Sequence, residues 1–520
     1  MSFFTAAIMK TIILSLLCLA GSLVAAFAAE TPASPRPNII VILADDLGYG
    51  DVQCYNPARG KIPTPHIDRL SSQGMRFTDA HSASSVCTPS RYALLTGRYP
   101  WRTHLQKSVV QPWEKPLIAP ERVTIATLAR QHGYQTGAFG KWHLGLDWQI
   151  PPEHAGLFQY GNKAGALELA ALGPDKQRAL WERIFSQPVA NGPITRGFDH
   201  YFGVDAPNLP PLCFIEDDRT VGMPTASNAN RPALEGWTFE PILPTITERA
   251  TMFIARSAAS SKPFFVYLPL TAPHAPLAVN AEWKGKSGLG LYGDFVMEVD
   301  AVVGRVIKAV AESGAAENTL VIFTSDNGCA PNVVDELERQ GHYPSGPLRG
   351  YKTSAWEGGH RVPFIVCWPK IVKPGSVCGQ LVHQSDLMAT FADILGTRLP
   401  GNVGEDSVSL LPLLEGRDEP VRQSAVSCSV DGVPGVRLGH WKYIPRFDGK
   451  VPAGRARPQV QLYDLSMDLG ETHNLAAEHP QRIAEMESLL QKLIRDGRST
   501  PGAPQKNDAA VIFEKGKRHE

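Results

Sequence analysis

A cysteine precedes a short helical pattern in residues 85–98, where the sequence reads SVCTPSRYALLTGR. Pro89 suits the first turn of a helix, because its missing N–H would have no partner there, and Gly97 suits the residue after the helix end. Cys87 is therefore expected at a helix N-terminus, where free amide N–H groups and the helix dipole favour an anion. A lone cysteine is more often an inert part of the core. The neighbouring residues must decide between these two interpretations.

Oxygen-bearing side chains follow two apolar segments, 37–44 and 319–323, that are typical of buried parallel strands. These side chains are Asp45, Asp46, Asp326 and Asn327. Ligands of open α/β sheets bind outside the carboxyl ends of the strands, so we expect the four to meet at one edge. Three carboxylates and an amide oxygen suit Ca²⁺ or Mg²⁺, and no cluster of histidines and cysteines indicates zinc. For the Asp-Asp pair taken alone, an exposed polar loop remains the alternative.

Basic side chains occupy comparable positions further along the chain. They are Lys141 and His143 after the strand-like segment 134–140, His274 after 263–270, and Lys352 within 350–359. A lone histidine is usually structural and a lone lysine is usually solvated, so none of these positions indicates a site by itself.

Four segments together resemble the signatures of the type I sulfatases, the formylglycine-dependent family. The segments are CTPSRYALLTGR at 87–98, GYQTGAFGKWH at 133–143, PHAP at 273–276 and GYKTSAWEGG at 350–359. The first segment matches the family signature at every defined position, and the similarity extends over about residues 37 to 497.

The resemblance implies that a separate formylglycine-generating enzyme oxidises Cys87 to Cα-formylglycine, whose hydrated aldehyde is a geminal diol. It also implies one divalent ion, Ca²⁺ rather than Mg²⁺. Its ligands would be Asp45, Asp46, Asp326, Asn327 and the modified residue 87.

The same resemblance and the chemistry of sulfate esters lead to an assignment of roles. One hydroxyl of the diol would attack sulfur. Arg91, Lys141 and Lys352 would hold the diol and neutralise the sulfate together with the metal. We assign His274, assisted by Lys352, as the acid toward the leaving oxygen, and His143 as the base that allows sulfate to be expelled. The two histidine assignments can be exchanged without contradicting the sequence.

The resemblance implies an α/β fold with two domains. Residues 37–400 would form a large alkaline-phosphatase-like domain with a mostly parallel central sheet flanked by helices. Residues 405–497 would form a small antiparallel sheet with one helix, and the polar tail 499–520 is expected to be disordered. In the small domain, the apolar patterns predict strands at 424–429, 436–444 and 461–465 and a helix at 480–496.

Residues 1–28 have the pattern of a cleavable signal peptide, with Lys10 before the apolar run 12–24 and Ala26-Phe27-Ala28 at the cleavage site. No later segment is long and apolar enough to span a bilayer. The chain has 51 basic and 51 acidic side chains, so no net charge draws it to nucleic acid or an acidic membrane. It contains no Asn-x-Ser/Thr sequon, which favours a bacterial periplasmic or secreted protein.

Seven cysteines remain after such a cleavage, and modification of Cys87 would leave six. An even number is consistent with disulfides in an oxidising compartment. Cys367 and Cys378 flank the Pro-rich segment WPKIVKPGSV, and we expect these two to pair.

The resemblance implies hydrolysis of sulfate monoesters. The overall spacing is similar to that of arylsulfatase A and the bacterial exo-acting carbohydrate sulfatases, which suggests a sulfated sugar of galactose or N-acetylgalactosamine type. We expect His154, Tyr160, Asn208 or their neighbours to shape the substrate pocket. Two alternatives stay open: a phosphate mono- or diester hydrolase of the alkaline phosphatase superfamily, and a non-catalytic protein that binds sulfated glycans and keeps Cys87 as a thiol. The sequence leaves open the sugar, the sulfate position, exo or endo action and the oligomeric state.

Overall fold

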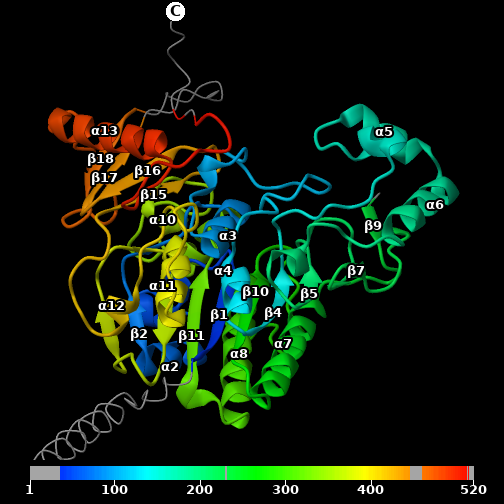
Figure 1. The fold of residues 1–520 in the computed structure, drawn as a ribbon, viewed down its shortest axis with the longest axis horizontal. Coiled ribbons are helices and arrows are strands. Elements are labelled where there is room, and N and C mark those ends of the chain that lie inside the picture. Colours follow the sequence, from blue (N-terminus) through cyan, green and yellow to red (C-terminus); the bar gives the residue numbers. More distant parts are fainter. Residues whose placement is uncertain (1–35, 229–230, 446–458, 512, 514–520) are drawn as a thin grey trace, which may run out of the picture. The chain divides into compact units, whose positions relative to one another are not determined.

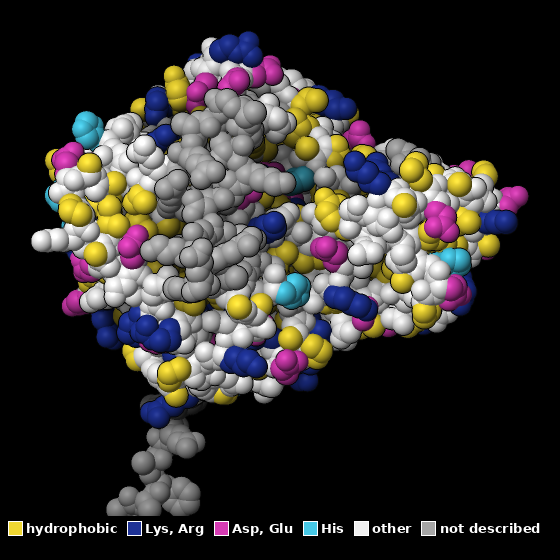
Figure 2. Space-filling view, turned by 90° about the horizontal axis from the view of Figure 1, so that it is seen from above, with side chains coloured by type: hydrophobic (Ala, Val, Ile, Leu, Met, Phe, Trp, Pro, Cys, Tyr) yellow, Lys and Arg dark blue, Asp and Glu magenta, His cyan; other side chains and the backbone are white. Residues whose placement is uncertain are grey.

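The structure is a computed structural model that describes residues 36–228, 231–445, 459–511 and 513. The residues from Pro37 onward cluster into one compact unit, and the fold below is that of this unit. The predicted signal peptide lies outside the described residues. Figure 2 shows basic and acidic side chains interspersed over one face, in keeping with their equal numbers in the sequence.

A ten-stranded mixed sheet forms the centre of the molecule (Figure 1). Its order is β13 (Ser376–Cys378), β2 (Met75–Phe77), β12 (Phe364–Cys367), β11 (Thr319–Ser325), β1 (Asn38–Asp45), β10 (Phe264–Pro273), β4 (Gln135–Lys141), β5 (His200–Val204), β6 (Ile215–Glu216) and β7 (Arg219–Thr220). The five neighbours from β11 to β5 are parallel, while β12 and β6 run against them. The expected mostly parallel sheet is therefore confirmed.

Strand β1 shows why its sequence is apolar throughout. Ile39 pairs with Phe265 of β10 on one side and with Leu320 of β11 on the other, so the strand is central. Successive side chains of a strand point to opposite faces. Ile39 belongs to one hydrophobic core and Ile40 to the other, and the rest of β1 continues this alternation. Both faces are covered, which explains the absence of polar positions.

Helices cover the sheet in two layers (Figure 1). One layer contains α2 (Pro65–Gln73), α7 (Ile242–Ala258) and α8 (Gly290–Glu312), and the other contains α3 (Cys87–Thr96), α4 (Ile125–Gln131) and α11 (Leu387–Leu395). In α8, a buried stripe of valines at helical spacing faces the core, and Val299 and Val303 are fully buried.

Several shorter elements complete this part of the chain. They are β3 (Ala80–His81) paired with β14 (Val382–His383), β8 (Ala226–Asn228) paired with β9 (Arg231–Ala233), α5 (Lys163–Ala171), α6 (Pro174–Phe185), α9 (Val334–Arg339), α10 (Glu357–His360) and α12 (Leu411–Leu414). Within the described part of the chain, none of the helices combines the length and the apolar composition needed to cross a membrane.

A small antiparallel sheet lies near the C-terminus. It consists of β15 (Ser424–Cys428), β16 (Pro434–Leu438), β17 (Trp441–Ile444) and β18 (Gln461–Asp464), with α13 (Pro480–Asp496) packed against it. The helix predicted at 480–496 is confirmed. The single strand predicted at 436–444 is wrong, because Gly439, at φ 57°, turns the chain and separates β16 from β17.

The described part of the C-terminal tail differs from the expected disorder. The Asp508 carboxylate accepts hydrogen bonds from the Arg98 guanidinium at 2.9 and 3.0 Å, and the Asp508 N–H donates to the Arg102 carbonyl oxygen at 2.8 Å. Phe513 packs edge-on against Trp101. Because Arg98 is fully buried, this tail supplies part of the charge that compensates its guanidinium.

The predicted disulfide between Cys367 and Cys378 is wrong, and all seven described cysteines are free. Strand β2 lies between β12, which carries Cys367, and β13, which carries Cys378. Two strands separated by a third are about 9–10 Å apart, beyond the reach of a disulfide.

Candidate active site

The carboxyl ends of β1 and β11 bring the predicted acids together. Asp45 ends β1, and Asp46 has a left-handed backbone with φ 65°, which turns its side chain away from the direction a regular strand would give. The Asp46 N–H donates to the Asp326 Oδ1 at 3.1 Å. The Asn327 side-chain N–H donates to the Asp46 Oδ1 at 2.8 Å. All four side chains are buried, so their charges are little screened by solvent.

Residue 87 is the first residue of α3, as the sequence predicted, and is 2% exposed. The Cys87 Sγ lies 3.6 Å from the Asp45 Oδ1. Burial raises the pKa of the Cys87 thiol to about 12, although Lys141 and Lys352 lower it in part. An unmodified thiol here would stay protonated at neutral pH, so the surroundings do not activate it as a nucleophile.

Three cations pair with the acids. The Lys141 Nζ lies 2.9 and 3.0 Å from the two Asp45 oxygens, and the Lys352 Nζ donates to the Asp46 Oδ2 at 2.7 Å. The Arg91 guanidinium donates to the Asp326 Oδ2 at 2.6 and 3.1 Å. We call these six side chains the catalytic cluster: Asp45, Asp46, Asp326, Arg91, Lys141 and Lys352.

The pKa shifts in the catalytic cluster follow from these pairs. Burial raises the pKa of Asp45, but Lys141, His274 and Arg91 outweigh it, so the pKa lies well below the usual range. Burial lowers the pKa of Lys141, but the Asp45 carboxylate outweighs it and raises the pKa. Both side chains are therefore charged at neutral pH.

His143 and His274 approach the cluster from the ends of β4 and β10. The His143 Nε2 lies 3.1 Å from the Val110 carbonyl oxygen, so this nitrogen carries the proton. The buried His143 Nδ1 has no hydrogen-bond partner among the described residues and keeps a free lone pair. Burial, followed by Lys141 and Arg91, lowers the pKa of His143 well below its usual value. The His274 Nδ1 donates to the Ala275 carbonyl oxygen at 2.6 Å, and its Nε2 lies 3.7 Å from the Asp46 Oδ2.

The loop that carries Lys352 lies against the end of β11. The Lys352 N–H donates to the Cys329 carbonyl oxygen at 3.0 Å. A Cβ added at Gly328 would lie 1.9 Å from the Gly358 carbonyl oxygen, so only glycine permits this approach. The spacing between 328 and 352 in the sequence gave no sign of this contact.

The donor atoms fit a divalent cation. Oxygen, nitrogen or sulfur atoms of Asp45, Asp46, Cys87 and His274 all lie within 4.8 Å of one another. The buried Asn327 Oδ1 has no hydrogen-bond partner among the described residues, although the amide nitrogen on the same side chain makes two hydrogen bonds. An unpartnered buried oxygen beside ionised carboxylates is the arrangement expected of a ligand for a hard cation.

Asp205 was missed in the sequence. It directly follows β5, and its Oδ1 accepts the backbone N–H of His143 at 3.1 Å. This is the same position after a parallel strand that identified Asp45 and Asp326. The short segment HYFGV, residues 200–204, would have had to be recognised as a strand.

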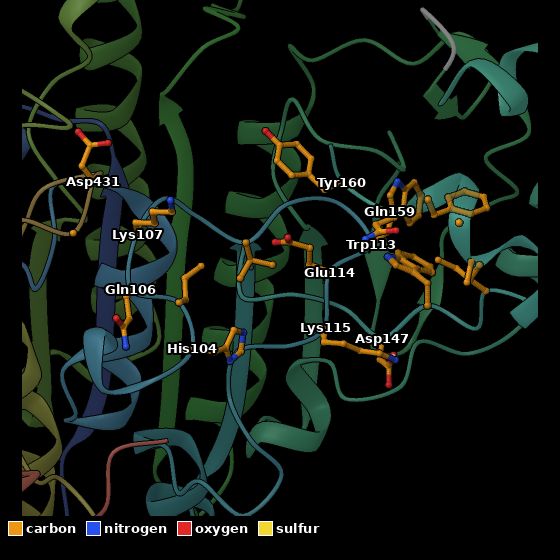
Figure 3. A pocket seen from close by; sticks show the side chains of 18 of the residues that line it. His104, Gln106, Lys107, Trp113, Glu114, Lys115, Asp147, Gln159, Tyr160 and Asp431 are labelled. Atoms are coloured by element: carbon orange, nitrogen blue, oxygen red, sulfur yellow. The ribbon is translucent and has the colours of Figure 1, made fainter. Parts of the chain in front are cut away.

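A cavity of about 1480 Å³ adjoins this site (Figure 3). Tyr160, one of three side chains expected to shape a pocket, lines it, whereas His154 and Asn208 are not among its described lining residues. Val110 lines the cavity and also accepts the hydrogen bond from His143, so the cavity and the active site share this segment as a wall.

Comparison with known proteins gives the family. The sulfatase family model matches residues 37–397, more than half of the chain. The chain belongs to the sulfatase family. The fold and the resemblance to sulfatases expected from the sequence are thereby confirmed.

Individual sulfatases are similar over almost the whole chain. An N-acetylgalactosamine-6-O-sulfatase of Bacteroides thetaiotaomicron is 35% identical over 497 residues, covering 88% of this chain and 93% of the relative. Human arylsulfatase A is 34% identical over 489 residues, covering 87% of this chain and 86% of that protein. A solved sulfatase structure from work on glycosaminoglycan metabolism by B. thetaiotaomicron is 32% identical with a TM-score of 0.74, covering 88% of this chain and 99% of that one.

The chain is therefore a sulfuric ester hydrolase. Sulfatases generally use a formylglycine nucleophile and a divalent metal ion, and the described site has the residues for both. These relatives favour sulfate ester hydrolysis over the phosphate esterase and the non-catalytic glycan-binding protein.

Proposed function

We propose that this sulfatase removes a sulfate group from a sulfated carbohydrate of galactose or N-acetylgalactosamine type, with residue 87 as formylglycine. The observation that carries the proposal is the burial of Cys87 beside three acids and three cations at the strand ends. The sugar class rests on the bacterial relative, whose name specifies N-acetylgalactosamine 6-sulfate esters.

Charge balance supports an anionic substrate. The catalytic cluster has three carboxylates and three cations, which compensate one another. A bound divalent cation would leave two positive charges in excess beside residue 87. In a buried site such an excess stabilises an anionic sulfate group and the charge that develops on it during transfer.

The chain's own residues supply the remaining steps of the proposed mechanism. As a hydrated aldehyde, residue 87 supplies a hydroxyl that attacks sulfur and a second hydroxyl whose deprotonation lets sulfate depart. The His274 side chain is 13% exposed. With its Nδ1–H held by the Ala275 carbonyl oxygen, the imidazolium form donates its Nε2 proton to the leaving alcohol oxygen. His143, neutral with a free Nδ1 lone pair, accepts the proton of the second hydroxyl. Arg91 orients Asp326, and Lys141 and Lys352 hold the sulfate oxygens.

Maturation requires a formylglycine-generating enzyme that reads Cys87, Pro89 and Arg91. Cys87 is 2% exposed and Arg91 is fully buried, so this enzyme must act before the chain folds. The signal-peptide pattern suits export to the periplasm or beyond after modification.

Mass spectrometry of the tryptic peptide 77–91 tests the nucleophile, because Cys87 is the only cysteine in it. Protein from a host with the modifying enzyme should give a peptide lighter than the cysteine form that shifts again with an aldehyde-reactive hydrazide. The same peptide from a Cys87→Ala variant should not react. An alkylatable thiol in the native, active protein would overturn the proposal.

We propose Ca²⁺ as the ion, because the expected ligands are oxygen atoms from three carboxylates and an amide. Removal with EGTA should abolish activity, and Ca²⁺ should restore it at lower concentration than Mg²⁺. Asn327→Ala should raise the Ca²⁺ concentration for half-maximal activity by at least about tenfold. Asn332→Ala, on the exposed segment nearby, is the control. Full activity with Mg²⁺ alone after rigorous Ca²⁺ removal would contradict this choice.

A further inference from the structure

The cavity beside the active site is larger than a sulfated monosaccharide needs. Its volume of about 1480 Å³ exceeds the roughly 300–1,000 Å³ of pockets that bind small molecules. Three segments line it, 104–115, 147–160 and 431–433, together with Phe513 near the C-terminus. None of the described residues that line it belongs to the catalytic cluster.

Backbone contacts tie this cavity to the catalytic groups on two sides. Val110 accepts the Nε2–H of His143 at 3.1 Å. On the other side, the N–H of Val430, the residue before the lining residue Asp431, donates to the Thr353 carbonyl oxygen at 3.1 Å. Thr353 directly follows Lys352. The cavity therefore lies next to the segments that carry His143 and Lys352. Sugar rings attached to a sulfated ring in the active site could extend into it.

Trp113 is built as a fixed aromatic surface of the cavity (Figure 3). Its ring packs edge-on against Phe158 at 5.2 Å and Trp148 at 6.2 Å, yet the residue is only half-buried. Its backbone is left-handed, with φ 71°, a conformation that costs free energy in a bulky residue. Such strain is found at ligand-binding sites, where the surroundings hold the residue in place.

Tyr160 adds a second aromatic surface. It lines the cavity and is 63% exposed, an unusual exposure for a large ring. The flat, apolar faces of sugar rings pack well on aromatic rings, whose hydroxyl and indole N–H groups tolerate a wet surrounding. Gln159, next to it, supplies an exposed amide for sugar hydroxyls.

The charges around the cavity argue against a densely sulfated chain. Lys115 is paired with Asp147 at 2.7 Å, so it offers no free charge. Glu114 and Asp431 are acidic, whereas Lys107 has no ion pair within the described residues. Acids thus outnumber free lysines, and closely spaced sulfates would be repelled.

We propose that this cavity binds the sugar rings next to the sulfated one, so that the preferred substrate is an oligosaccharide whose neighbouring rings carry no sulfate. This inference rests on the proposed function. Trp113 and Tyr160 provide the stacking surfaces, and Lys107 contacts a hydroxyl or a single carboxylate.

The test compares three substrates: an aryl sulfate, N-acetylgalactosamine 6-sulfate, and a trisaccharide whose terminal ring is the only sulfated one. The wild type should show its highest kcat/KM with the trisaccharide. Tyr160→Ala should lower that value by about tenfold, mainly through KM, and leave the other two substrates within about twofold. Trp113→Phe, which keeps the aromatic packing, should also lower kcat/KM for the trisaccharide more than for the other two substrates.

Leu167→Ala is the matched control, because Leu167 is 72% exposed on α5 and does not line the cavity. Equal losses on all three substrates, or no loss on the trisaccharide, would overturn the subsite. A wild type that prefers the monosaccharide would overturn it as well, while leaving the proposed function intact. A wild type that hydrolyses the aryl sulfate but neither sugar sulfate would overturn the proposed function and the subsite with it.

Discussion

Two buried clusters of charge in this protein contain the same kinds of groups but are built for different purposes. The first is the catalytic cluster. The second joins the small sheet to the large one and also has three acids and three cations; we call it the clamp cluster: Asp79, Glu357, Glu471, Arg361, Arg437 and Lys442. In both, oppositely charged groups lie within about 3 Å of each other.

The histidines distinguish the two clusters. In the clamp, Asp79, His81, His360 and Lys442 form a continuous row of hydrogen bonds of 2.8, 3.1 and 3.1 Å that engages all four ring nitrogens. Burial lowers the pKa of both clamp histidines, so the row is occupied by neutral rings. By contrast, His143 keeps a nitrogen without a partner among the described residues. A histidine that must move protons needs such a nitrogen, and a structural histidine does not.

The same reasoning decides how to interpret a second metal-like group. Atoms of His81, Glu357 and His360 lie close enough to hold an ion. However, the Lys442 ammonium already lies 3.0 Å from Glu357, and it and Arg437 compensate that carboxylate. With cations in place and ring nitrogens engaged, this group is an ion-pair clamp rather than a metal site.

Breaking the clamp should give the largest effect on stability. Lys442→Met leaves Glu357 and Glu471 buried without their ammonium partner, and should lower the unfolding free energy by about 3–5 kcal/mol. Activity of the folded enzyme at low temperature should change little. Urea unfolding and kcat/KM on an aryl sulfate, both measured with Ca²⁺ present, check the two statements.

Lys492→Met is the control for the clamp, because Lys492 forms a solvent-exposed pair with Asp496 in the same C-terminal region, and losing it should leave the unfolding free energy almost unchanged. The double variant Glu357→Gln, Lys442→Met should be less destabilised than the sum of the single variants. A Lys442→Met protein of normal stability but without activity would contradict the distinction between the clusters.

Disrupting the catalytic cluster should instead lower activity and leave stability almost unchanged. Lys352→Ala removes the cation that we propose holds a sulfate oxygen, and should lower kcat/KM by about 10²–10³-fold, the usual cost of losing one preorganised oxyanion partner. With Ca²⁺ bound, Asp46 keeps a compensating charge, so the melting temperature should change little. Lys373→Ala, an exposed lysine, should leave kcat/KM unchanged. A loss below tenfold for Lys352→Ala would remove this lysine from the site.

The clusters also differ in how far the sequence predicted them. Each acid of the catalytic cluster lies at the end of a parallel strand or just after it, and the interior of a strand such as β1 is apolar because both faces are covered. Position alone therefore brings Asp45 and Asp326 together. The clamp joins segments near 79, 357, 437 and 471, and only the packing of the small sheet makes them neighbours.

The predictions that failed share one cause: the outcome depends on contacts between segments that are distant in the sequence. The expected Cys367–Cys378 pair failed because β2, from a segment about 300 residues earlier, inserts between β12 and β13. Local spacing contains no information on such an insertion. The polar tail was expected to be disordered from its composition, but it serves as a partner for the buried Arg98.

Asp205 allows the smallest and most selective test, because it supports His143 without belonging to either cluster. Burial raises the pKa of Asp205 to about 6, although the His143 N–H and Lys141 lower it in part. The folded protein thus binds a proton more tightly than the unfolded chain, where an aspartate has a pKa of about 3.9. The stabilisation that protonated Asp205 provides is complete below about pH 4 and is lost as the pH rises through about 6.

Asp205→Asn keeps the acceptor for the His143 N–H but cannot ionise. The unfolding free energy of the variant relative to the wild type should therefore rise by about 2–3 kcal/mol between about pH 4 and pH 7 and then level off. Urea titrations of both proteins across this range measure the difference, in which the titration of all other groups cancels. Parallel curves would show that Asp205 titrates normally in the folded protein, and that His143 is held in place by a carboxylate in contact with solvent.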